Sequence, residues 1–167
     1  MGILTKDMQR LAREQRLGFV ATVCADGTPN LSPKGTTTVW DDDHLIFADI
    51  CSPGTIANLV RNPAVEVNVV DPITRRGYRF KGEATIVPAG PLFEHAMNFF
   101  RDTYGLSDAL AGRVEHVVLI KVRQAAPLIS PIYDTGASEE DVVRRYAEYY
   151  ENLRKQRAGG TVKSTGV

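Results

Sequence analysis

The sequence has few cysteines and no long apolar run. Its two cysteines, Cys24 and Cys51, have neither C-x-x-C spacing nor histidine neighbours at the spacing of a zinc site. We therefore predict that both are buried free thiols. No stretch approaches the roughly 20 apolar residues that cross a bilayer, and residues 1–16 are charged throughout, without the apolar core of a signal peptide. We expect no membrane partner and a cytoplasmic location.

An excess of charge is also missing. Twenty Lys and Arg residues balance twenty Asp and Glu residues, and no long run has one sign. Binding of nucleic acid requires a concentrated positive field. We therefore predict no nucleic-acid partner.

Several catalytic signatures are absent. The sequence contains no G-x-S-x-G, no Walker loop and no G-x-G-x-x-G. His44, His95 and His116 fall on a predicted turn, a helix and the start of a strand, without a matching set of carboxylates. We predict no metal site, and we assign no catalytic residue.

The length and apolar content are those of one domain. The 167 residues, 43% of them apolar, are enough for one core and short for two. We predict a single domain over residues 1–157, ending in a C-terminal helix, and a disordered tail over residues 158–167.

Strand patterns alternate with a few helical ones. Thr5 is a suitable N-cap for a helix that ends near Arg16, and Ser52-Pro53 suits the start of a second helix that ends before Pro63. Further helices are expected from Pro91 to Gly105 and after Ser138. Strands are expected over 18–24, from 29 with a continuation over 36–40, and over 45–50, 64–70, 77–88 and 115–123. Without regular βα alternation, this order predicts a mainly β chain with added helices, a small antiparallel barrel of six strands.

Four segments follow one another in an informative order. They read L-G-F-V-A-T-V-C-A-D-G-T-P-N-L-S-P-K-G, H-L-I-F-A-D-I, S-P-G-T-I-A-N-L-V-R-N-P-A-V-E-V-N-V and Y-R-F-K-G-E-A. This succession resembles the pyridoxamine 5'-phosphate oxidase-like FMN-binding split-barrel family over roughly Leu11 to Arg123. The resemblance implies a six-stranded split barrel and a homodimer, with FMN bound where the two subunits meet. The Val-rich segment 64–70 and the aromatic helices also suggest apolar surface for a dimer.

The same segments contain groups that suit FMN, which combines a dianionic phosphate with a flat ring. Ser52, Thr55 and the amides after Pro53 lie at a predicted helix N-terminus, where free N–H groups favour an anion. Asn58 could add a side-chain donor one turn later. The plainer interpretation of Ser52-Pro53 is a helix start that needs no ligand.

Two further segments complete the candidate site. Ser32, Pro33, Lys34 and Gly35 offer a hydroxyl, a cation and close approach to a ligand. The resemblance implies that the strand end Ala48, Asp49 and Ile50 lies along the flavin ring, and that Arg79 reaches the cofactor from the neighbouring strand or subunit. Alternatively, Lys34 and Arg79 are solvated strand residues and the Asp49 carboxylate is structural.

The chain departs from genuine pyridoxamine phosphate oxidases. Their Arg-x-Val-Leu-Leu-Lys and Ser-Arg-Lys segments are replaced by residues 32–36 and 53–55, so at least two basic phosphate partners are missing. Their C-terminal substrate-binding strand, with its Trp and Arg, is replaced by residues 131–134 and a Tyr-rich helix. We therefore do not expect oxidation of vitamin B6. The chain more closely resembles uncharacterised bacterial relatives with an S-P-K-G or S-P-R-G segment.

The function implied by the resemblance is an FMN-dependent oxidoreductase acting on a small-molecule redox substrate. One alternative is a non-catalytic protein that stores or senses flavin, and another is a reductase of the same fold that uses the deazaflavin coenzyme. A haem-binding branch also exists, for which His95 is the one conceivable axial ligand; we interpret His95 as a residue on the helix surface.

Overall fold

The computed structural model describes residues 2–159, which fall into two compact units. The first comprises the chain up to residue 70 together with 77–128, and the second comprises 71–76 and the residues from 129 onward. The assignment of residues 1–157 to a single domain stays a prediction. Residues 160–167 of the predicted tail lie outside the described residues, whereas Ala158 and Gly159 belong to the last helix.

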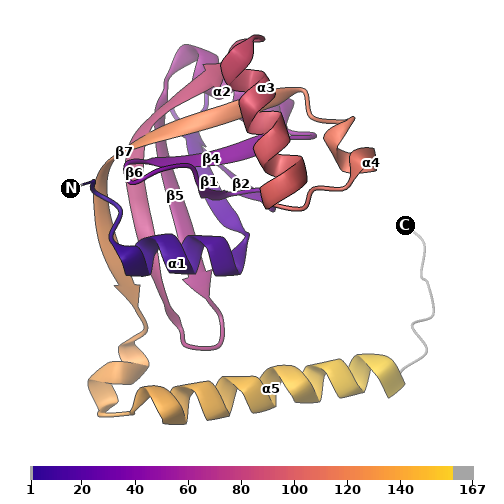
Figure 1. Cartoon of the computed structure of the whole chain (residues 1–167). Helices are drawn as coiled ribbons and strands as arrows, with labels where there is room; N and C mark the ends of the chain where they lie inside the picture. Colours follow the sequence, from indigo (N-terminus) through magenta and orange to yellow (C-terminus); the bar gives the residue numbers. More distant parts are fainter. Residues whose placement is uncertain (1, 160–167) are drawn as a thin grey trace. The chain divides into compact units, whose positions relative to one another are not determined.

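A curled antiparallel sheet forms the first unit (Figure 1), which confirms the mainly β fold class. The strand order is β2-β1-β5-β6-β7-β4-β3. Within residues 2–159 the sheet has seven strands rather than six. They are β1 (Gly18–Val23), β2 (Pro29–Lys34), β3 (Thr38–Val39), β4 (His44–Asp49), β5 (Ala64–Asp71), β6 (Arg76–Val87) and β7 (His116–Ile129).

The expected continuation of the second strand over residues 36–40 is wrong. Part of that segment forms a separate strand, β3, which accounts for the seventh strand. After Lys34 the chain turns, with the Thr37 N–H donating to the Lys34 carbonyl at 3.2 Å. The short strand β3 then pairs with β4, at Thr38 with Ile46 and at Val39 with Leu45. This reversal places the end of β2 beside the end of β4.

The helices start largely where the sequence predicts. Thr5 caps α1 (Lys6–Gln15), its hydroxyl accepting from the Met8 N–H at 3.3 Å. The expected helix from Pro91 is shorter in its α-helical part and continues as a π-helical turn, and a short helix not predicted from the sequence follows it. The helical elements after α1 are α2 (Pro53–Arg61), α3 (Pro91–Asn98), the π-helical turn Phe99–Thr103, α4 (Asp108–Ala111), the 3₁₀ turn Pro131–Thr135 and α5 (Glu139–Gly159).

Strand β7 runs six residues beyond its expected end at Arg123. Its pairing with β4 ends at Lys121, so beyond that point one side of β7 is an edge. Proline lacks the N–H that a central strand donates but is tolerated at an edge. Pro127 therefore lies within the strand instead of ending it.

Strand β4 is buried on both faces. Leu45 and Phe47 belong to the barrel core, while Ile46 and Ala48 pack in a second cluster with residues of α3 and the turn after it. Burial on both sides explains its nearly continuous apolar run. Val65, Val67 and Val69 of β5 point into the barrel core and provide no surface for a dimer, whereas Val70 at the end of the same segment is exposed.

The second unit is held by aromatic and charged contacts. The Arg75 guanidinium lies 4.7 Å from the centre of the Tyr146 ring, and that of Arg76 lies 4.2 Å from the Tyr133 ring. The Tyr133 hydroxyl donates to the Thr74 carbonyl at 2.5 Å. These contacts connect the turn at 71–76 to the C-terminal residues.

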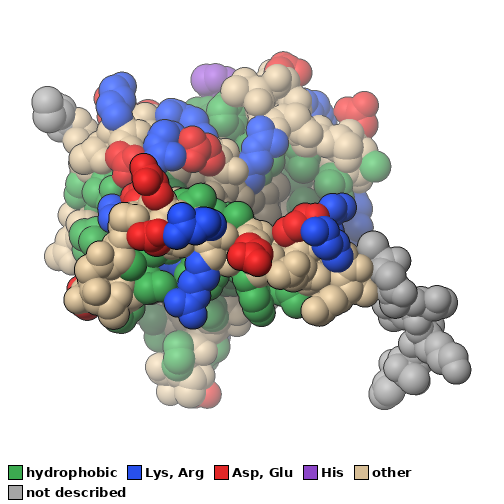
Figure 2. Space-filling view, turned by 90° about the horizontal axis from the view of Figure 1, so that it is seen from below, with side chains coloured by type: hydrophobic (Ala, Val, Ile, Leu, Met, Phe, Trp, Pro, Cys, Tyr) green, Lys and Arg blue, Asp and Glu red, His purple; other side chains and the backbone are tan. Residues whose placement is uncertain are grey.

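The surface carries mixed charge. On the face shown in Figure 2, Lys and Arg side chains are interspersed with Asp and Glu, and hydrophobic side chains lie between them. Among the described helices, none combines the length and the apolar content needed to cross a membrane.

Candidate functional site

A cavity of about 540 Å³ lies where β2 and β4 end. Its volume falls within the range typical of small-molecule sites. The turn after β2, the connection from β4 to α2 and the segment after the π-helical turn supply its walls. The lining residues are Ser32, Pro33, Lys34, Gly35, Thr36, Ala48, Ile50, Cys51, Ser52, Tyr104, Leu106 and Leu110.

The cavity brings together most of the residues chosen from the sequence. The segment Ser32–Gly35 contributes one side, and Ala48, Ile50 and Ser52 contribute another. The two segments meet because β3 folds back onto β4. Thr36 joins them, its hydroxyl donating to the Ala48 carbonyl at 2.8 Å and accepting from the Ala48 N–H at 3.0 Å.

Lys34 is the buried cation of this site. Only 6% of the residue is exposed, so the interpretation of Lys34 as a solvated strand residue is wrong. Its ammonium donates to the Ser32 hydroxyl at 2.6 Å. Desolvation lowers the pKa of Lys34, and electrostatic interactions with Asp49 and Cys51 partly oppose that shift. A buried ammonium of this kind favours an anionic ligand.

Tyr104 closes another side of the cavity. Its hydroxyl donates to the Gly35 carbonyl, and the Arg16 guanidinium lies 4.5 Å from the centre of its ring. Burial raises the pKa of Tyr104. The position follows a π-helical turn, and such turns are frequent at functional sites. Tyr104 was not among the residues chosen from the sequence, because the periodicity of the helix does not reveal where the π turn redirects the chain.

Cys51 also lines the cavity and was not chosen from the sequence. Both cysteines are free thiols, but Cys51 is exposed and Cys24 is half-buried, so the prediction that they are buried is wrong. Cys51 follows the end of β4, where the chain leaves the sheet for α2. The tertiary turn at this point exposes a side chain whose residue type suggested burial.

Ser52 does not cap α2 with its side chain. It occupies the N-cap position, but its hydroxyl donates to the Asp49 carboxylate and makes no capping hydrogen bond. The helix begins at Pro53 with Ser52 at its N-cap, as expected. The N–H groups of the first turn of a helix have no partner within the helix, which suits an anion.

Thr55 and Asn58 do not line the cavity. Both are buried in α2. The Asn58 amide nitrogen donates to the Thr22 hydroxyl at 3.1 Å, and its oxygen accepts from Arg61 at 2.8 Å. Asn58 thus connects α2 to β1.

Arg79 does not line the cavity that contains Lys34. Its guanidinium donates to one Glu66 oxygen through Nε at 3.0 Å and through Nη2 at 2.6 Å. It lines a separate cavity of about 190 Å³ with Lys81, Gln124, Ala125 and Ala126. Contact with a cofactor bound to a neighbouring subunit stays a prediction.

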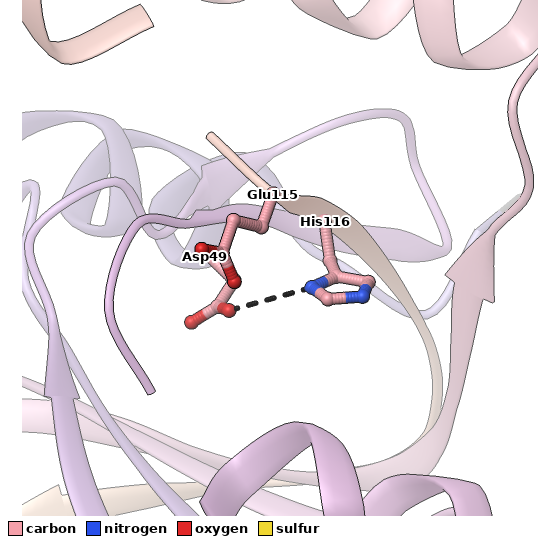
Figure 3. A group of neighbouring side chains, drawn as sticks. All are labelled: Asp49, Glu115 and His116. Carbon is pink, nitrogen blue, oxygen red and sulfur yellow. Dashed lines mark ion pairs between the residues drawn. The ribbon is translucent and has the colours of Figure 1, made fainter. Parts of the chain in front are cut away.

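The histidines have different environments. His95 packs edge-on against Trp40, with ring centres 5.0 Å apart. His116 lies beside two carboxylates, those of Asp49 and Glu115 (Figure 3). The expectation that no histidine has a matching set of carboxylates is therefore wrong at His116, because strand pairing unites residues that are far apart in the sequence.

Comparison with known proteins identifies a family. The family model described as pyridoxamine 5'-phosphate oxidase matches residues 4–125. The chain belongs to this family. The resemblance inferred from the sequence is thereby confirmed, and the matched segment contains every residue that lines the cavity. No curated protein matches the chain.

Several solved structures share the family fold. HupZ of Group A Streptococcus is 32% identical, with a TM-score of 0.65, over 75% of this chain and 94% of HupZ. An FMN-binding protein from Syntrophomonas wolfei subsp. wolfei is 16% identical, with a TM-score of 0.58, over 73% of this chain and 86% of that one. An F420 reductase is 23% identical, with a TM-score of 0.57, over 73% and 98%. The last two likenesses concern the fold alone.

Proposed function

We propose that this member of the family is an FMN-binding flavoprotein, and that it acts as an oxidoreductase on a small molecule in the cytoplasm. The observation that carries the proposal is the buried ammonium of Lys34 in the wall of a cavity of about 540 Å³. Buried charges in proteins are paired, and Asp49 offsets the charge of this ammonium only in part, so the phosphate of FMN would supply a direct anionic partner. The solved FMN-binding protein of the same fold supports this assignment.

Different residues of the cavity would bind the phosphate and the ring of FMN. Lys34 and the Ser32 hydroxyl, which line the cavity, would hold the phosphate, and the N-terminus of α2 begins directly after the lining residue Ser52. Gly35 and Ala48 present backbone and small side chains, which suit a flat ring. Bound FMN would supply the electron transfer, while the lining residues orient it and limit the access of water.

We further propose a homodimer with a cofactor site at the interface. Phe19 of β1 is 41% exposed and Leu31 of β2 is 64% exposed, on neighbouring strands at one edge of the sheet. Large exposed apolar side chains of this kind favour association. In the dimer, Arg79 of one subunit would reach the cofactor of the other, as the resemblance implies.

The test is an absorption spectrum of the purified full chain before and after FMN is added and dialysed away. Retention of about one flavin per chain would support the proposal. A colourless protein that retains no FMN would refute it. A parallel titration with the deazaflavin coenzyme tests the second candidate, which the F420 reductase of the same fold favours.

Turnover decides between an enzyme and a storage protein. The flavin-loaded protein should oxidise NADPH or NADH, or react with oxygen after reduction. Stable flavin binding without turnover of these partners would favour the non-catalytic alternative. Pyridoxamine phosphate should not be oxidised, and its oxidation would contradict the inference drawn from the missing basic residues.

A further inference from the structure

Asp49, Glu115 and His116 form a compact cluster beside the cavity (Figure 3). Asp49 is the last residue of β4, and His116 is the first residue of β7, directly opposite it in the antiparallel ladder. The Glu115 N–H donates to the Asp49 carbonyl at 3.0 Å. Backbone hydrogen bonding therefore holds all three residues in register.

The three side chains present their polar atoms to one another. One carboxylate oxygen from each acid and one imidazole nitrogen all lie within 4.8 Å of one another. The distance from Nδ1 of His116 to Oδ2 of Asp49 is 3.7 Å. Asp49 is only 1% exposed, so its carboxylate is enclosed by protein.

An orphaned atom in this cluster points to a ligand. Nδ1 of His116 is buried and has no hydrogen-bond partner among the described residues. Buried polar atoms are normally paired, and one without a hydrogen-bond partner calls for an explanation such as a bound ion. Figure 3 shows this nitrogen directed toward the carboxylate of Asp49, not away from it.

We propose that Asp49, Glu115 and His116 bind one divalent transition-metal ion. One imidazole nitrogen and two carboxylate oxygens are ligands that suit Zn²⁺, with positions left open for water or a substrate. Bonds of about 2.1 Å would place the ligand atoms roughly 3.4 Å apart in a tetrahedral arrangement. Glu115 is exposed, so its side chain can move to bring its carboxylate oxygen from within 4.8 Å of the other two ligand atoms to the shorter separation that the metal requires.

The site is distinct from the flavin assignment but adjacent to it. Ser52 lines the cavity and donates to the Asp49 carboxylate, so one hydroxyl touches both regions. Lys34 interacts electrostatically with Asp49 and partly offsets its negative charge. Loss of the Lys34 charge should therefore weaken FMN binding without weakening metal binding. The FMN proposal and the metal proposal can thus be refuted independently of each other.

Calorimetric titration of the full chain with Zn²⁺ tests the proposal. Cys51→Ser serves as the background, because the exposed thiol two residues from Asp49 is itself a potential zinc ligand. One ion should bind per chain, and His116→Gln and Glu115→Gln should each raise the dissociation constant by about tenfold or more. His44→Gln is the matched control, because Nδ1 of His44 lies 2.8 Å from Asp41 in a pair that is not part of the cluster. It should leave the dissociation constant unchanged.

Two results would overturn the site. The first is the absence of saturable Zn²⁺ binding. The second is equal binding by the background protein and His116→Gln, with circular dichroism showing both folded. Either result would leave His116 as an ion-pair partner of Asp49 only.

Discussion

Replacement of Lys34 by Met tests the centre of the proposed cofactor site. The substitution keeps much of the volume of the side chain and removes its charge. The side chain of Lys34 is largely enclosed, and its ammonium donates to the Ser32 hydroxyl. With FMN bound, the same ammonium would face a phosphate dianion. The change therefore acts in opposite directions on the two states.

The magnitudes follow from the burial of the charge. Removing one partner of a buried ion pair costs about 3–5 kcal/mol, and partial exposure of the phosphate to water reduces this to about 2–4 kcal/mol. FMN affinity should fall by roughly 30- to 1,000-fold. The free energy of unfolding of the protein without FMN should stay the same or rise by about 1 kcal/mol, because a buried charge that Asp49 compensates only in part is lost.

The pH dependence gives an independent check on the same residue. The pKa of Lys34 in the folded chain lies below its ordinary value of 10.5, so between the two values the unfolded chain binds more protons. The stability of the ligand-free protein should therefore rise with pH up to about 10.5 through this group. FMN affinity should fall over the same range as the ammonium loses its proton. Lys34→Met should flatten both dependences.

Flavin fluorescence quenching measures the affinity, and urea denaturation measures the stability. Lys121→Met is the control, because Lys121 pairs with Asp43 at 3.0 Å and does not line the cavity. An FMN dissociation constant for Lys34→Met within about threefold of the unaltered value, with Lys121→Met behaving alike, would refute the reasoning.

Three further substitutions separate binding from folding. Asn58→Ala should lower the free energy of unfolding by about 1–3 kcal/mol, because the Thr22 hydroxyl loses a buried partner. The same variant should leave the FMN dissociation constant unchanged. A loss of FMN affinity in the folded variant would show that Asn58 takes part in cofactor binding. Phe47→Ala should cost about 3–5 kcal/mol in urea denaturation, since Phe47 is fully buried, and a cost below about 1 kcal/mol would contradict its place in the core. Tyr104→Phe removes the hydrogen bond to Gly35 and should weaken FMN binding by about fivefold, with little change in the thermal midpoint; unchanged affinity would show that Tyr104 only packs.

Local sequence signals located most of the elements. Thr5 and the Ser52-Pro53 pair marked helix starts, and the alternation of valines in β5 marked a half-buried strand. These signals depend on neighbours within a few residues, so they can be recognised without knowledge of the fold. The turn after Lys34 was missed because the apolar and Thr-rich run that follows looks like a continuing strand. The pairing of β3 with β4, which decides the matter, is not local.

The order of the quoted segments was sufficient to assign the family and to select most of the residues that line the cavity. The residue types alone suggested that Lys34 could be a solvated cation and that Cys51 was buried. The structure reversed both, because the environment of a side chain depends on what the rest of the chain places around it. Tyr104 lies far from Gly35 in the sequence, and only tertiary folding brings its hydroxyl to that carbonyl.

The sequence by itself determined the class of fold, the family and the candidate segments, because these depend on periodicity, turn residues and the succession of motifs along the chain. Tertiary structure alone decided which of those residues share a cavity. In the folded chain, Arg79 and Asn58 lie away from the cavity that contains Lys34. Asp49 and His116 lie opposite each other on the paired strands β4 and β7. Distances between side chains are set by strand register and by chain reversals, and a one-residue change in register moves a side chain to the other face of the sheet.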